Sequence, residues 1–84
     1  MRPYPRFALA MAFHLLNAAA WAASSSLDGL AAYRRGDYKR ALRAFEKAAE
    51  DEDGIAANYL GEMYATGKGV ASDHGKAVAW FRKA

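Results

Sequence analysis

Asp73 and His74 are the neighbouring pair whose side chains could do acid–base chemistry, with the carboxylate orienting the imidazole. Adjacent residues of a helix point about 100° apart, so these two side chains cannot form a hydrogen-bonded dyad on one face. We therefore interpret Asp73 as a helix cap and His74 as a surface residue. The other histidine, His14, stands alone in an apolar stretch and indicates neither a ligand nor a base.

The remaining candidates for chemistry are also incomplete. There is no cysteine, which excludes thiol catalysis, thiolate metal sites and disulfides. No Gly-x-Ser-x-Gly motif occurs, and no serine has a lysine three residues later. Gly67-Lys68-Gly69 lacks the earlier glycine and the following Ser/Thr of a phosphate loop. Glu50-Asp51-Glu52-Asp53 lacks the alternating spacing of a calcium loop and is interpreted as a solvated turn. The sequence thus predicts no catalytic residue, metal site or cofactor.

The last third of the chain, which carries Asp73 and His74, predicts a helical hairpin. Small or apolar residues recur at helical spacing, first at Ala57, Leu60, Gly61 and Tyr64, then at Ala77, Val78, Phe81 and Ala84. Between the two helices, glycines flank Lys68, because glycine adopts the left-handed backbone values that end a helix. Asp73 is expected to cap the second helix.

Another helical hairpin is predicted over residues 27–50, after a polar linker at residues 24–26. Its first helix is expected to bury an apolar face formed by Leu27, Leu30, Ala31 and Tyr33. Gly36-Asp37 interrupts the helical period, which then resumes at Tyr38, Ala41, Leu42, Phe45, Ala48 and Ala49. Asp53 is placed to cap the next helix, which is expected to begin near Ile55.

Residues 54–84 resemble one Sel1-like repeat, a relative of the tetratricopeptide repeat. The resemblance is carried by Ala56, Leu60-Gly61, Tyr64, Gly67, Gly69-Val70, Asp73, Lys76-Ala77, Trp80-Phe81 and Lys83-Ala84. Residues 27–50 are similar to a tetratricopeptide hairpin with a tighter turn. Tyr33 corresponds to Tyr64 at an offset of 31, whereas Phe45 corresponds to Phe81 at an offset of 36. The resemblance implies an all-α fold of Sel1-like α–α hairpins, a fragment of a right-handed α-solenoid, in which Trp80 packs.

The same resemblance implies a binding scaffold rather than an enzyme. In such arrays the first helix of each hairpin lines a concave groove, and its outward residues select a peptide or protein partner. The matching positions of this chain are Arg34, Arg35, Asn58, Glu62, Ala65 and Thr66. The alternative is that these side chains are merely solvated.

Residues 1–23 have the layout of a secretory signal peptide. A basic start with Arg2 and Arg6 precedes an uncharged, mostly apolar run at residues 7–23, in which Ala20 and Ala22 bracket Trp21 as a cleavage site requires. An uncleaved membrane anchor is the alternative, although the run is shorter than the roughly 20 apolar residues of a spanning helix. The sequence therefore predicts a periplasmic or secreted protein that meets the membrane only during export.

The net charge argues against nucleic acid as a partner. The whole chain carries 12 Lys and Arg against 9 Asp and Glu, a formal charge of +3. Arg2 and Arg6 belong to the leader, so the chain from Ser24 onward has a net charge of only about +1. Binding to nucleic acid requires a larger and more concentrated basic excess.

We therefore expect an exported, non-enzymatic module that binds a peptide or protein in a helical-repeat groove. The alternatives are an envelope hydrolase acting on cell-wall material, because some Sel1-like proteins are linked to such activities, and a membrane-tethered scaffold. Two hairpins bury little apolar surface, and the chain reaches Ala84 within a pattern that the first hairpin completes at Glu50. Continuation into further repeats, or a homodimer, is therefore expected.

Overall fold

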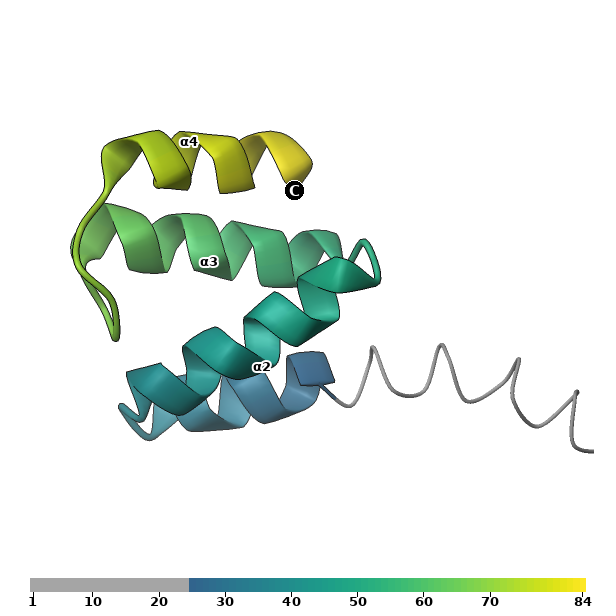
Figure 1. The fold of residues 1–84 in the computed structure, drawn as a ribbon. Coiled ribbons are helices and arrows are strands. Elements are labelled where there is room, and N and C mark those ends of the chain that lie inside the picture. The colour runs from purple at the N-terminus through teal and green to yellow at the C-terminus, as the bar shows by residue number, and fades with distance from the viewer. Residues whose placement is uncertain (1–24) are drawn as a thin grey trace, which may run out of the picture.

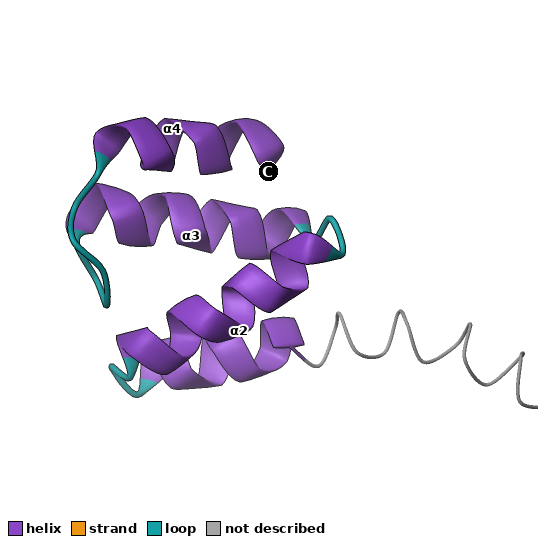
Figure 2. Cartoon of the chain, viewed as in Figure 1, coloured by secondary structure: helices purple, strands orange, loops and turns teal. Residues whose placement is uncertain are grey.

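Four helical segments make up the part of the chain that the structure describes, residues 25–84. In this computed structural model they are the helix of residues 25–34, α2 (Tyr38–Glu50), α3 (Gly54–Thr66) and α4 (His74–Lys83), and residues 25–84 contain no strand (Figures 1 and 2). The predicted all-α class of helical hairpins is confirmed. The predicted leader at residues 1–23, with His14, lies outside the described residues.

The first helix begins earlier than predicted. Ser25 and Ser26, expected in a linker, already belong to the first helix. No helix within residues 25–84 combines the length and the apolar character that crossing a bilayer requires.

The core lies along α3, which runs between α4 and the first hairpin (Figure 1). Its largest fully buried side chains are Phe45 of α2 together with Leu60 and Met63 of α3. Alanines fill the remaining core positions, namely Ala32, Ala41, Ala48 and Ala56. Each large side chain contributes about 1.5–3 kcal/mol by burial, whereas the alanines mainly allow the helices to approach closely.

Two glycines let phenylalanine rings reach the helix backbone. A Cβ atom at Gly29 would lie 2.6 Å from the Phe45 ring, and one at Gly61 would lie 2.6 Å from the Phe81 ring. The α3 backbone at Gly61 is therefore in close contact with the Phe81 side chain of α4. Gly29 and Gly61, which are 32 positions apart, thus make the same kind of contact with a phenylalanine ring. The buried positions Ser26, Gly29 and Ala32 instead match Ala57, Leu60 and Met63 at an offset of 31, the offset predicted from the tyrosines.

The buried face of the first helix also differs from the prediction. Leu27 is 66% exposed and Ala31 is exposed, whereas Gly29 and Ala32 are buried. The Phe45 ring occupies the space beside Gly29, so this face needs small residues rather than leucine. Leu30 and Tyr33 do pack against the core, so the predicted face is right for two of its four residues and wrong for Leu27 and Ala31.

Aspartates begin the later helices as predicted. Asp53 Oδ1 accepts hydrogen bonds from the backbone N–H groups of Ile55 at 3.0 Å and Ala56 at 3.3 Å. Asp73 Oδ1 accepts one from the N–H of Lys76 at 3.0 Å. These bonds satisfy amide groups that the first turn of a helix leaves without partners. At the far end of α3, Gly67 has φ 74° and donates its N–H to the Met63 carbonyl, which closes the helix.

Candidate binding surface

A hydrogen-bonded cluster of Tyr33, Glu62 and Lys68 joins the two hairpins. The Tyr33 hydroxyl donates to Glu62 Oε1 at 2.7 Å, and Lys68 Nζ donates to the Tyr33 hydroxyl at 2.9 Å. Lys68 Nζ also lies 3.7 Å from Glu62 Oε1. The three side chains come from the first helix, from α3 and from the loop between α3 and α4. The cluster therefore holds three separate segments in one arrangement.

Aromatic rings extend this cluster into the core. The ring centroid of Tyr33 lies 5.3 Å from that of Tyr38 and 5.2 Å from that of Tyr59, and both pairs have edge-to-face geometry. Tyr59 in turn stacks on Phe45 at 4.9 Å. Lys68 Nζ lies over the Tyr33 and Tyr38 rings, at 5.1 and 5.6 Å from their centroids. Edge-to-face pairs and cation–π contacts both favour these separations, so the junction between the hairpins is a specific packing arrangement.

The glycine loop places Lys68 in this junction. Gly69 has φ 73°, and a Cβ atom at Gly69 would lie 2.7 Å from the carbonyl carbon and oxygen of Tyr38. The loop therefore rests directly on the backbone at the start of α2. Sequence reasoning assigned a loop to Gly67-Lys68-Gly69 but missed this docking, because nothing in the local sequence connects it with Tyr38.

The charges of the cluster shift the ionisation of Tyr33 and Lys68. The hydrogen bond from Lys68 lowers the pKa of Tyr33, but burial and the neighbouring Glu62 carboxylate outweigh it, so the pKa lies above its ordinary value of 10.0. The hydrogen bond to Tyr33 raises the pKa of Lys68 above 10.5. Tyr33 is therefore held as a neutral phenol and Lys68 as an ammonium ion.

Three of the predicted binding residues form one stripe on α3. Asn58, Glu62 and Thr66 recur at every fourth position, which places them along one side of the helix. Asn58 and Thr66 are exposed, and Glu62 is half-buried because it accepts the bond from Tyr33. The Thr66 hydroxyl donates to the Glu62 carbonyl oxygen at 2.8 Å. Ala65 is half-buried beside this stripe.

The other two predicted binding residues, Arg34 and Arg35, are exposed at the end of the first helix. They follow Tyr33 in sequence, and Tyr33 contacts the middle of the α3 stripe through Glu62. The described contacts place Tyr33, but neither arginine, against the stripe. We call Arg34, Arg35, Asn58, Glu62 and Thr66 together the junction surface.

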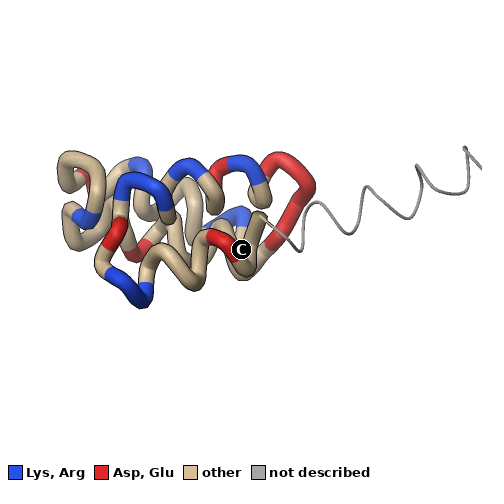
Figure 3. Tube along the Cα trace, turned by 90° about the horizontal axis from the view of Figure 1, so that it is seen from below, with Lys and Arg blue, Asp and Glu red and all other residues tan. Residues whose placement is uncertain are grey.

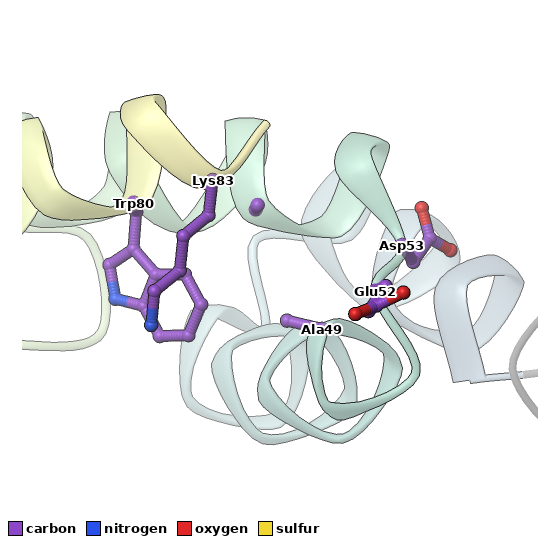
Figure 4. A pocket seen from close by; sticks show the side chains of 6 residues that line it. Ala49, Glu52, Asp53, Trp80 and Lys83 are labelled. Atoms are coloured by element: carbon purple, nitrogen blue, oxygen red, sulfur yellow. The ribbon is translucent and has the colours of Figure 1, made fainter.

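A cleft that the sequence did not predict lies where α4 faces the turn between α2 and α3. It has a volume of about 420 Å³ and is lined by Ala49, Glu52, Asp53, Ala57, Trp80 and Lys83 (Figure 4). Trp80 is partly buried and packs against the core, as expected. The run of acidic residues was the available signal, but only the tertiary fold brings it opposite Trp80. We call this hollow the acidic-turn cleft.

Asp73 and His74 make no catalytic pair. The Asp73 carboxylate caps α4, and His74 is exposed. Across residues 25–84, no three histidine, aspartate or glutamate side chains gather as metal ligands would.

Two α–α hairpins packed through a shared aromatic junction are the architecture of helical-repeat proteins. Beta-lactamase HcpA of Helicobacter pylori (strain J99 / ATCC 700824) is similar to this chain, with 38% identity over 50 residues. HcpA is a Sel1-like repeat protein, so this similarity confirms the resemblance that the motifs predicted. The match covers 60% of this chain and 20% of HcpA. No family model and no solved structure matches the chain.

Proposed function

We propose that the protein is an exported, non-enzymatic interaction module that binds a peptide or protein segment on the junction surface. The observation that carries the proposal is the cluster of Tyr33, Glu62 and Lys68, which fixes the first helix against α3. A surface fixed before binding loses little conformational freedom when a partner arrives, which favours affinity.

The junction surface offers several kinds of contact to such a partner. Arg34 and Arg35 supply positive charge, and Asn58 supplies an amide that can both donate and accept hydrogen bonds. Exposed polar groups arranged on a rigid helical support are typical of peptide-binding helical repeats. The similarity to a Sel1-like repeat protein supports the same class of function.

Peptide selection from a random phage-displayed library tests this proposal. Selected peptides should bind the protein and lose at least about tenfold in affinity when Arg34 and Asn58 are replaced together by alanine, the cost expected of anchor residues. The matched control is Arg43→Ala with Glu46→Ala, at exposed positions of α2, which should leave binding unchanged. Selection of no peptide beyond an unrelated helical hairpin, or equal losses in both variants, would refute the proposal.

The location of the protein belongs to the same proposal. A cleaved leader at residues 1–23 would deliver it to the periplasm or the exterior, and the absence of a spanning helix in residues 25–84 is compatible with this. N-terminal sequencing of the protein recovered from the periplasm should begin at Ala23 or Ser24. An intact Met1 would instead favour the membrane-tethered alternative.

The name of the relative favours one alternative, an enzyme that opens β-lactam rings. Hydrolysis of a chromogenic cephalosporin by the purified chain tests it directly. We expect no turnover above buffer. Turnover that persists through purification and is abolished by Ser72→Ala or His74→Ala, both at exposed positions, would replace the binding proposal by an enzymatic one.

A further inference from the structure

We propose that the acidic-turn cleft binds the side chain of a lysine or arginine of a basic peptide. The cleft is built by α2, the turn after it, α3 and α4, and it shares no residue with the junction surface. The proposal therefore stands or falls independently of the function proposed above.

The walls of the cleft suit the aliphatic part of such a side chain. Ala49 and Ala57 present methyl groups from two helices, and the Trp80 indole forms the side that belongs to α4 (Figure 4). Long basic side chains bind in this way, with the methylene stem on apolar surface and the charged end at a polar rim. The volume of about 420 Å³ is ample for one such side chain.

The charge of the cleft favours a cation. Two carboxylates, those of Glu52 and Asp53, line it against one ammonium, that of Lys83. Glu50, the last residue of α2, and Asp51 add two more negative charges directly before them in the chain, and the four residues form a continuous acidic stretch in Figure 3. An acidic ligand would be repelled here, whereas a lysine or arginine would meet an excess of negative charge.

Glu52 is the carboxylate that is free to bind the incoming charge. Asp53 Oδ1 already accepts two backbone hydrogen bonds at the start of α3. The backbone N–H of Glu52 donates to the Ala49 carbonyl at 3.0 Å, but no group among residues 25–84 forms a hydrogen bond or an ion pair with the Glu52 carboxylate. A lysine or arginine at Glu52 would thus gain a charge-assisted hydrogen bond without displacing a contact of the fold.

Lys83 shows that Trp80 accepts a cation. Lys83 Nζ lies 4.8 Å from the centre of the indole ring, within the range of a cation–π contact. This lysine occupies the ring and repels a second positive charge. Removing its charge should therefore improve the cleft for a basic ligand, while removing the charge of Glu52 should weaken it.

The experiment titrates the ¹⁵N-labelled full chain with four peptides, acetyl-Gly-Gly-X-Gly-Gly-amide, in which X is Lys, Arg, Glu or Leu. The lysine and arginine peptides should shift the Trp80 indole N–H resonance and the Ala49 and Ala57 amides. A dissociation constant on the order of 1 mM is expected for a single anchoring side chain. The glutamate peptide should cause no shift at the same concentrations.

Two variants of opposite sign separate binding from a change of fold. Glu52→Gln should weaken binding of the lysine peptide about threefold, the effect of one partly exposed charge pair. Lys83→Gln should strengthen it about twofold to threefold by freeing the indole face. Glu46→Gln, at an exposed position of α2 outside the cleft, is the matched control and should change nothing.

Three results would overturn the proposal. The first is the absence of any shift up to about 10 mM lysine peptide, a range in which contacts of this kind are detectable. The second is a response to the leucine and glutamate peptides that is as large as the response to the lysine peptide. The third is a loss of affinity in Glu46→Gln as large as that in Glu52→Gln. None of these results bears on the junction surface, because the variants leave Arg34 and Asn58 unchanged. The peptide selection described above tests that surface separately.

Discussion

Gly29 and Gly61 each pack against a phenylalanine ring, but the surroundings of the two rings differ. Each glycine leaves room for a phenylalanine ring at a distance that a methyl group would violate. Phe45, beside Gly29, is fully buried and stacked on Tyr59, whereas Phe81, beside Gly61, is 44% exposed. The ring at Gly61 can therefore move outward, and the ring at Gly29 cannot.

We expect Gly29→Ala to destabilise the protein and Gly61→Ala to be nearly neutral. Alanine favours a helix over glycine by about 1 kcal/mol, but overpacking a closed site costs about 1–3 kcal/mol. At Gly29 the cost of overpacking exceeds the gain in helix propensity, because the Phe45 ring cannot move. At Gly61 the gain offsets the cost of a small displacement of Phe81. Urea unfolding followed by circular dichroism measures both variants. Equal midpoints for the two variants would contradict this account.

Tyr33 and Lys68 make the hairpin junction sensitive to alkaline pH. Both have a pKa above its ordinary value in the folded protein, so the unfolded chain loses these protons first. The stabilisation is therefore complete at neutral pH and is lost as the pH rises through the folded-state values, from about 10 upward.

Tyr33→Phe should consequently flatten the alkaline loss of stability, although it lowers stability at neutral pH by about 1 kcal/mol for the lost hydrogen bonds. Melting temperatures measured at about pH 8 and about pH 11 provide the comparison. Tyr64→Phe is the control, because the Tyr64 hydroxyl forms no hydrogen bond with residues 25–84. Parallel alkaline losses in wild type and Tyr33→Phe would show that the junction does not titrate as described.

At the scale of elements, the loop between α3 and α4 is a packing element as well as a connection. Gly69 rests on the Tyr38 backbone, and Lys68 reaches the first helix from the same loop. Gly36 also has a positive φ, 79°, but a Cβ atom there would meet nothing within 4 Å. A substitution at Gly36 therefore tests backbone strain alone, whereas one at Gly69 tests backbone strain together with the docking of the loop.

We expect Gly69→Ala to destabilise the protein clearly more than Gly36→Ala. Both place alanine in the left-handed region, at a cost of about 1–2 kcal/mol. Only Gly69→Ala adds a collision with backbone atoms, which cannot rotate away. Thermal melts measure the difference, and hydrogen exchange of the α2 amides should rise in Gly69→Ala alone. A smaller loss for Gly69→Ala than for Gly36→Ala would argue that the loop does not dock on α2.

Sequence reasoning located the elements because their signals are local. Asp53, Asp73 and Gly67 act where they stand in the chain, as caps and terminators, and all three do so in the structure. The face of the first helix was predicted only in part, because Leu27 outweighs Gly29 in hydrophobicity, while the contact with Phe45 needs a residue without a side chain. A packing requirement between distant residues leaves no hydrophobic signal in a short window.

At the scale of the whole molecule, α3 is the helix through which the two hairpins stabilise each other. It contacts both α2 and α4, and it supplies Leu60 and Met63 to the core. Loss of packing on α3 should therefore affect both hairpins together instead of one of them.

Leu60→Ala should cost about 2–5 kcal/mol, as a buried leucine truncation does. It should shift the unfolding of both hairpins equally. Trp80 fluorescence in a Trp21→Phe background follows α4, while circular dichroism follows all the helices. The fluorescence and circular dichroism transitions are expected to coincide, both in the Trp21→Phe protein and in the same protein with Leu60→Ala. A Trp80 transition that separates from the helical one would mean that the second hairpin unfolds by itself.

The candidate sites were accessible from the sequence to different degrees. Arg34, Arg35, Asn58, Glu62 and Thr66 came from the repeat resemblance, and whether they bind a partner stays a prediction. The second role of Glu62, as acceptor for Tyr33, depends on a contact between residues 29 positions apart. The acidic-turn cleft was missed for the same reason, because Glu52 and Trp80 become neighbours only in the folded chain.

The series of aromatic rings at the hairpin junction also has an optical consequence. It consists of Tyr38, Tyr33, Tyr59 and Phe45. Aromatic rings held in a fixed asymmetric arrangement give near-ultraviolet circular dichroism, which disappears when packing is lost even if helices persist. Three of these four rings are tyrosines, and the centroids of successive rings in the series lie about 5 Å apart. The tyrosine band of this protein should thus report on the seam between its hairpins, while the far-ultraviolet signal reports on the helices themselves.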